Sequence, residues 1–193
     1  MLRLIVLALF CSGIAMGTEA FFKPAQAVTL CALTLGLVGC ASDYKPSGQP
    51  TFYQSMATAD AKLDAAAAAS MISGYRRNNG LSVVSLDPLL MKAAEEQARA
   101  MASKNRFEHD AAGPFAQRIK RSGYDAKIAV ENIGAGYHTL AEAFSGWRDS
   151  PPHRANMLRS GVTKMGIAAV YSPKSKYKVF WALILAEPDD RRG

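Results

Sequence analysis

The pattern of apolar and polar positions changes character twice along the 193 residues. Residues 1–39 hold two nearly continuous apolar runs, and residues 41–56 are polar, with two prolines and a glycine. Apolar positions at helix and strand spacing begin only after residue 57. We therefore expect a signal sequence over 1–39, a cysteine and tether over 40–56, and one folded domain over 57–193.

The first part of the domain carries helical patterns. Asp87 and Pro88 mark a helix start, because Asp is a favoured N-cap and Pro suits the first helical turn. Thr139 and Glu142 have the spacing of a capping box. Helices are predicted over 57–79, 88–105 and 115–123, from 139 through Trp147, and as a short piece after Pro151–Pro152.

The second part of the domain carries strand patterns. Three runs rich in β-branched and aromatic residues lie at 128–135, 165–171 and 178–186, and the last two are separated by a short polar loop. The expected class is α+β: a small antiparallel three-stranded sheet flanked by helices.

The apolar run over 27–40 is typical of an export signal. It has 14 residues, fewer than the roughly 20 that span a bilayer, and it ends in Leu37-Val38-Gly39-Cys40, the form of a lipobox. We predict that Cys40 becomes the first mature residue and carries lipid, including palmitate. Because no Asp follows Cys40, the anchor is expected in an outer membrane, facing the periplasm. The run before Lys23 is either an extra membrane segment over 1–22 or lies upstream of a true start at Met16.

Composition narrows the function further. The three cysteines are Cys11, Cys31 and Cys40, so the domain itself has no disulfide and no thiol chemistry. The net charge of +7 is spread along the chain, whereas nucleic-acid binders gather basic residues on one face. We expect a membrane partner through Cys40 and no nucleic acid.

Two histidines and a glutamate are the candidate functional residues. His153 follows two prolines at a predicted helix start, which fixes its backbone. Glu131 lies in a predicted strand between apolar residues, where a carboxylate is either hydrogen-bonded or functional. His109 follows the long predicted helix. The three are 22 residues apart at each step, so no local metal motif joins them.

Several motifs together resemble one known family. They are FEHD at 107–110, Gly123-Tyr124, ENIGAG at 131–136, Trp147 with DSPPHRANML at 149–158, and KMGIAAVY at 164–171. Their order and spacing are similar to those of the CAP superfamily (SCP-like proteins: cysteine-rich secretory proteins, venom antigens and plant pathogenesis-related proteins) in its short bacterial form. The resemblance covers about residues 65–187.

The resemblance implies an α-β-α sandwich with a cleft in which two histidines and two glutamates converge. Three of these positions fall on His109, Glu131 and His153. The fourth falls near Asp149 and Ser150, where this chain has no Glu, so Asp149 is the candidate substitute. His138 matches no motif position and is expected at the surface.

The chemistry of this set has three alternatives at the level of the sequence. Two imidazoles and a carboxylate suit Zn²⁺ or another divalent cation. The same groups suit general acid–base catalysis. The third alternative is a buried hydrogen-bond network, which holds loops together without a metal or a reaction. We expect a lipid-anchored binding or scaffold module of the bacterial envelope, with a lipid or cell-wall ligand. The alternative is a divalent-metal-dependent hydrolase acting on envelope peptides or cell wall.

Overall fold

The computed structural model describes residues 48–189, which belong to one compact unit. The predicted signal sequence and Cys40 lie outside the described residues. The elements, in chain order, are η1 Thr51–Tyr53, α1 Ala65–Asn78, β1 Ser85–Leu86, α2 Pro88–Lys104, α3 Phe115–Ser122, β2 Ala126–Ala135, α4 Leu140–Asp149, α5 Pro151–Met157, β3 Lys164–Tyr171 and β4 Val179–Pro188.

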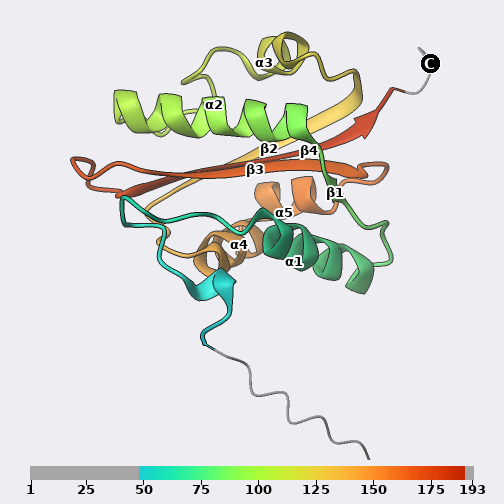
Figure 1. Ribbon diagram of the computed structural model, residues 1–193. Coiled ribbons are helices and arrows are strands. Elements are labelled where there is room, and N and C mark those ends of the chain that lie inside the picture. The colour runs from blue at the N-terminus through green and yellow to red at the C-terminus, as the bar shows by residue number, and fades with distance from the viewer. Residues whose placement is uncertain (1–47, 190–193) are drawn as a thin grey trace, which may run out of the picture. The chain divides into compact units, whose positions relative to one another are not determined.

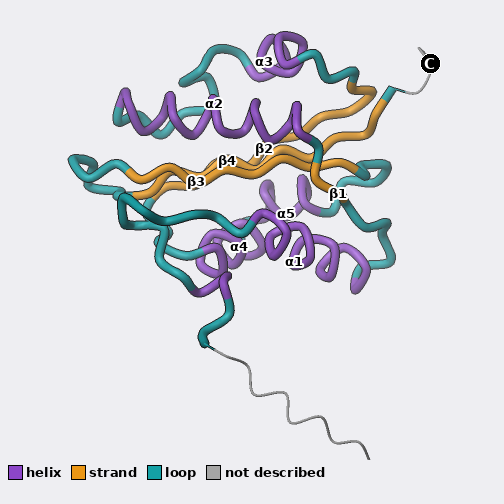
Figure 2. Tube along the Cα trace, in the orientation of Figure 1, coloured by secondary structure: helices purple, strands orange, loops and turns teal. Residues whose placement is uncertain are grey.

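The elements form three layers, with the sheet in the middle (Figures 1 and 2). Helices α2 and α3 cover one face of the sheet, and α1, α4 and α5 cover the other. The strand order is β1-β3-β4-β2, and β4 pairs antiparallel with both β3 and β2. The expected α-β-α sandwich and its antiparallel core of three strands are confirmed.

Two details differ from the sequence prediction. The sheet has a fourth strand, because the two residues of β1 pair in parallel with the start of β3. The first helix begins at Ala65 rather than at 57, because Asp64 is its N-cap and accepts a hydrogen bond from the Ala67 amide at 2.9 Å. An extended N-cap residue ends the helical conformation on its N-terminal side, whatever the helix propensity of the alanines before it.

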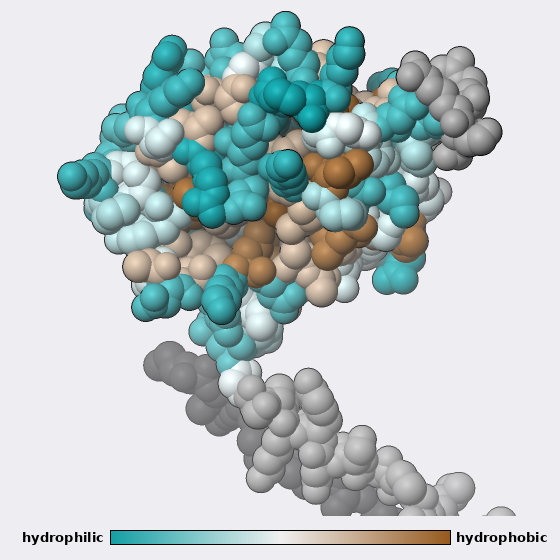
Figure 3. Space-filling model, turned by 45° about the horizontal axis from the view of Figure 1, so that its top comes forward, coloured by the Kyte–Doolittle hydropathy of each residue, from teal (hydrophilic) through white to brown (hydrophobic). Residues whose placement is uncertain are grey.

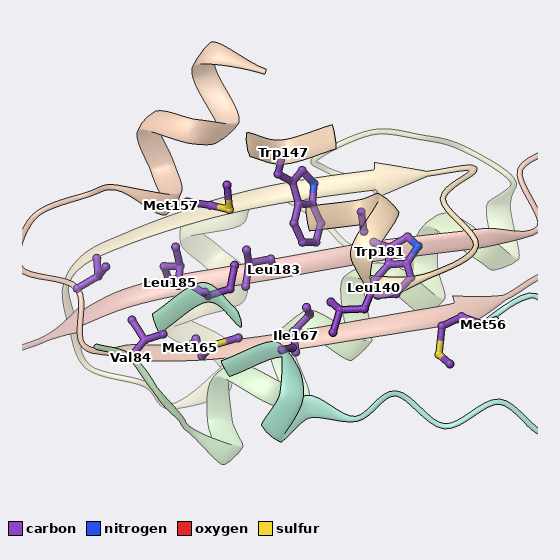
Figure 4. Packing of buried hydrophobic residues seen from close by; sticks show 14 of the residues in the cluster. Met56, Val84, Leu140, Trp147, Met157, Met165, Ile167, Trp181, Leu183 and Leu185 are labelled. Atoms are coloured by element: carbon purple, nitrogen blue, oxygen red, sulfur yellow. The ribbon is translucent and has the colours of Figure 1, made fainter. Parts of the chain in front are cut away.

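The core lies on both faces of β4, whose residues are almost all buried. Trp181, Leu183 and Leu185 point toward the α1–α4–α5 layer, where Trp147 meets Trp181 edge to face with ring centroids 6.5 Å apart (Figure 4). The alternate residues of β4 point the other way: Ala182, Ile184 and Ala186 pack with α2. Alternate side chains of a strand point to opposite faces, so a strand between two helical layers is apolar throughout.

Helix α2 lies close to the sheet because a glycine faces it. A Cβ on Gly166 of β3 would overlap the backbone of Leu90 and Met91 in α2. The predicted start of this helix is confirmed, since the Asp87 carboxylate accepts from the amides of Leu89 and Leu90. Cap and glycine together fix where α2 begins and how closely its first turn lies on the sheet.

The outer surface is mixed in character. Figure 3 shows hydrophilic residues alternating with smaller apolar areas on the side turned forward. None of the helices within residues 48–189 has both the length and the apolar character needed to cross a bilayer.

Candidate functional site

Glu131 is the centre of the candidate site. It lies in the middle of β2, opposite Ile184 of β4, and its side chain is only 2 % exposed. One carboxylate oxygen, Oε1, is 2.9 Å from His109 Nδ1, and the other, Oε2, accepts a hydrogen bond of 2.7 Å from Arg118 Nη2. The alternative that this carboxylate is hydrogen-bonded therefore holds in the structure, and one of its partners is a predicted site residue.

His109 reaches Glu131 from the loop between α2 and α3. Gln97 of α2 is fully buried and holds this loop at two points, donating to the Glu108 carbonyl at 2.7 Å and accepting from the Ala112 amide at 3.1 Å. The His109 side chain remains 57 % exposed. The loop thus presents an imidazole to solvent while one of its nitrogens touches a buried carboxylate.

Amide side chains hold the backbone of His153 against the strand that carries Glu131. Asn132, next to Glu131 on β2, donates from Nδ2 to the His153 carbonyl at 2.9 Å. Asn156 of α5 donates from Nδ2 to the Glu131 carbonyl at 3.1 Å and to Asn132 Oδ1 at 2.9 Å. These bonds dock α5 on β2, and the first two residues of α5 are the prolines that precede His153.

The His153 ring is partly buried, and this affects its protonation. Burial lowers its pKa below the ordinary value of 6.5, and the nearby charge of His109 lowers the pKa further. Both effects disfavour the imidazolium form. His153 is therefore a neutral imidazole at pH 7, with one ring nitrogen that accepts and one that donates.

The other predicted residues, Asp149, Ser150 and His138, form their hydrogen bonds with other partners. Asp149 is exposed and forms an ion pair with Arg148, with Oδ1 2.8 Å from Nε. This hydrogen bond is the main reason that the pKa of Asp149 is lowered. Ser150 is the residue between α4 and α5, and His138 is exposed and takes part through its backbone in the cap of α4.

A three-ligand metal centre fits this arrangement poorly. Within residues 48–189, no three His, Asp or Glu side chains are grouped closely enough to hold an ion. Moreover, both oxygens of Glu131 already have partners, Arg118 on Oε2 and His109 Nδ1 on Oε1, so an ion would have to share or displace one of them. Four surface hollows of about 370–690 Å³ in the described residues are lined elsewhere, so the cleft expected at this site stays a prediction.

The sequence analysis missed the residues that hold the site together, Arg118 above all. In α3, Arg118 occupies the same stripe as Phe115, Ile119 and Ser122, with the spacing of a buried helix face. A charged residue on such a stripe needs a buried partner, and that signal was available. Gln97, on the apolar stripe of α2, carries the same signal.

Comparison with known proteins agrees with the fold. The model of the CAP, or cysteine-rich secretory protein, family matches residues 69–185. Among curated proteins, the uncharacterized protein YkwD of Bacillus subtilis (strain 168) is 31% identical over 138 residues, which make up 64% of this chain and 53% of that protein. The chain thus spans about half the length of the curated relative it matches.

Solved structures show the same architecture. An SCP-domain extracellular protein from Bacillus anthracis is 23% identical, with a TM-score of 0.56 over 63% of this chain and 39% of its own. An outer surface protein from Borrelia burgdorferi is 20% identical, with a TM-score of 0.57 over 67% of this chain and 98% of its own. With a family model matching most of the domain, and the fold shared with these proteins, the chain belongs to the cysteine-rich secretory protein (CAP) family.

Proposed function

We propose that the chain is an exported, lipid-anchored binding module of the bacterial envelope, whose recognition site is built around His109, Glu131 and His153. The observation that carries the proposal is the exposed His109 imidazole held on the buried Glu131 carboxylate. A polar group that is fixed by a buried partner and open to solvent can bind a ligand without losing its own freedom on binding.

Export and surface location are supported from two sides. The lipobox at Leu37–Cys40 precedes the compact unit, which begins at Lys45 and so takes in most of the segment expected as a tether. The similar solved proteins include one titled extracellular and one titled an outer surface protein. The proposal places this chain on the periplasmic face of an outer membrane, held there by lipid at Cys40.

The ligand class that we propose is envelope lipid or cell wall. A neutral His153 and a His109 with one nitrogen on Glu131 offer hydrogen bonds suited to the hydroxyl, amide and phosphate groups of both. The aromatic side chain of Phe107, two residues from His109, is 44% exposed and packs against Tyr177 at a centroid distance of 6.4 Å. It adds apolar surface next to the polar groups.

The alternative function is a divalent-metal-dependent hydrolase. Two histidines, His109 in the loop after α2 and His153 in α5, could offer nitrogen ligands for Zn²⁺. A carboxylate ligand for such a centre would have to compete with existing partners, because Glu131 meets Arg118 and His109 and Asp149 is paired with Arg148. We therefore place this alternative second.

Sedimentation with envelope components tests the proposal. A chain of residues 41–193, which lacks both the apolar leader and Cys40, is mixed with purified peptidoglycan and, separately, with vesicles of phosphatidylethanolamine and phosphatidylglycerol. We expect it to bind one of the two, and we expect His109→Ala to weaken that binding by about tenfold or more, equal to about 1.4 kcal/mol. His138→Ala is the matched control, because that histidine is exposed and outside the site. Equal binding by both variants, or binding to neither component, would contradict the proposal.

A further inference from the structure

Arg118 lies behind the candidate site, in the middle of α3. Its side chain is fully buried, and its guanidinium lies 5.2 Å from the centre of the Phe115 ring. The structure describes one other fully buried arginine, Arg76, whose hydrogen bonds go to backbone carbonyls and a serine hydroxyl. Of these two, Arg118 is the one that meets a carboxylate.

One nitrogen of Arg118 contacts both halves of the His109–Glu131 pair. Nη2 donates to Glu131 Oε2 at 2.7 Å and to the backbone carbonyl of His109 at 3.1 Å. A second nitrogen, Nε, donates to the Gly113 carbonyl at 3.1 Å, farther along the same loop. The guanidinium therefore fixes the loop that carries the histidine and the carboxylate that the histidine meets.

This geometry determines where the proton of His109 lies. A carboxylate paired with a guanidinium is ionised, and an ionised carboxylate can only accept hydrogen bonds. With Oε2 on Arg118, Oε1 faces His109 Nδ1, so Nδ1 must be the protonated nitrogen. In the neutral ring, the free lone pair is then on Nε2, on the exposed side chain.

We infer that Arg118 is a positioning residue that holds His109 in the Nδ1–H form, with Nε2 open to accept a hydrogen bond from a ligand. The inference deepens the proposed function and rests on it for the role of Nε2. The position of the proton, in contrast, is a property of the ligand-free protein and is measured on its own.

The competing explanation is that Arg118 only holds the loop between α2 and α3 in place and has no effect on the proton of His109. Arg121 provides the matched control, because it is on the same helix and donates to the Ala112 carbonyl of the same loop at 3.2 Å. Its ion pair is with Glu96, on the surface, and within residues 48–189 it forms no hydrogen bond or ion pair with Glu131. Arg121 thus contacts the loop alone, whereas Arg118 contacts both the loop and Glu131. Comparing variants of the two arginines separates the two explanations.

The experiment is nitrogen-15 NMR of the full-length chain in detergent, with labelled histidine, at about pH 8, where an ordinary imidazole is neutral. The chain has three histidines, so His138→Gln and His153→Gln assign the signals. The wild type should show His109 as a single form, with Nδ1 protonated and Nε2 bare. Arg121→Met should leave this pattern unchanged. Arg118→Met should lose it, with both ring nitrogens partly protonated.

Two further observations keep the inference falsifiable. If Arg118→Met does not fold, Arg118→Gln replaces it, because a glutamine amide can still donate to the loop carbonyl but brings no charge to keep Glu131 ionised. It should also lose the single form. A wild-type spectrum with Nε2 protonated, or a folded Arg118 variant that keeps the wild-type pattern, would overturn the inference. No ligand is present in these spectra, so a failure to bind envelope components would count against the proposed function alone.

Discussion

At the scale of single residues, the main feature is a carboxylate that is buried without being isolated. Removing a charge from water costs several kcal/mol, and only close, well-oriented partners offset that cost. Glu131 has a cation on one oxygen and an imidazole on the other, and its own backbone carbonyl is bonded by Asn156. The site is therefore part of the stability of the domain as well as a candidate for recognition.

Replacing Arg118 should destabilise the fold strongly. Arg118→Met leaves Glu131 buried with only His109, and breaking a buried ion pair at one end costs about 3–5 kcal/mol. Arg121→Met removes an exposed ion pair and should cost at most about 1 kcal/mol. Urea unfolding of both variants measures the difference. Similar losses for the two would show that the buried pair is not the larger contribution.

The partly buried His153 predicts a loss of stability in acid. Its pKa is lowered in the folded protein, so the unfolded chain takes up a proton first, at about 6.5. The free energy of unfolding should thus fall as pH drops below that value, until the folded-state pKa is reached. His153→Gln should show a smaller fall between about pH 7 and pH 5, measured by urea unfolding at each pH. His138→Gln, at an exposed position, should follow the wild type; a His153→Gln curve parallel to the wild type would contradict the prediction.

Some residues of the site can be predicted from the sequence and others cannot. The local sequence is enough to single out Glu131, a carboxylate inside an apolar strand pattern, and His153, a histidine after two prolines. The contact between His109 and Glu131 joins residues 22 positions apart, and only the resemblance to the family suggested it. Arg118 escaped notice because the partner that explains its buried position lies on another element.

At the scale of elements, the first turn of α2 packs closely on β3. Gly166 permits that approach, since any side chain there would overlap the α2 backbone. A helix backbone cannot move aside as a flexible side chain can, so the whole helix would have to shift.

Gly166→Ala should therefore destabilise the domain by about 1–3 kcal/mol through overpacking. Gly74→Ala is the control within α1, where an added Cβ would meet open space. That change should stabilise by about 0.5–1 kcal/mol, because alanine loses less backbone entropy in a helix. Thermal unfolding of both variants measures the two signs. A Gly166→Ala protein as stable as the wild type would show that α2 adjusts at little cost.

Element boundaries divide into those that local chemistry predicts and those that it does not. The caps at Asp87 and Thr139 were visible because their side chains bond to amides of the next turn. The start of α1 was placed too early, because an alanine-rich stretch outweighed the signal of Asp64. The two-residue β1 was missed because only its pairing with Lys164 and Met165 makes it a strand.

At the scale of the whole molecule, the layered domain and the proposed membrane anchor rest on different evidence. The apolar patterns predicted a small sheet flanked by helices, and the resemblance to the family added the α-β-α layering that the structure shows. The anchor depends on Cys40, outside the described residues, and on the motif around it.

The proposed anchor predicts how the full chain partitions. In a bacterium that processes lipoproteins, the wild type should enter the detergent phase of a detergent–water separation, because an acyl chain adds about 0.8 kcal/mol of membrane affinity per buried CH₂. Cys40→Ala should remain in the aqueous phase or keep an unprocessed leader, visible by mass spectrometry. Equal partitioning of the two mature proteins would contradict lipid attachment at Cys40.

The most direct test of the account is calorimetric titration of Zn²⁺ into the purified chain, with His109→Ala and His153→Ala alongside. The central claim is that Glu131 belongs to Arg118 and His109, in a binding site that needs no metal. The account predicts that the wild type does not bind zinc tightly, and that the heats of titration are the same for the wild type and both variants. One ion bound tightly by the wild type, and lost in both variants, would contradict the claim and make the hydrolase the better proposal.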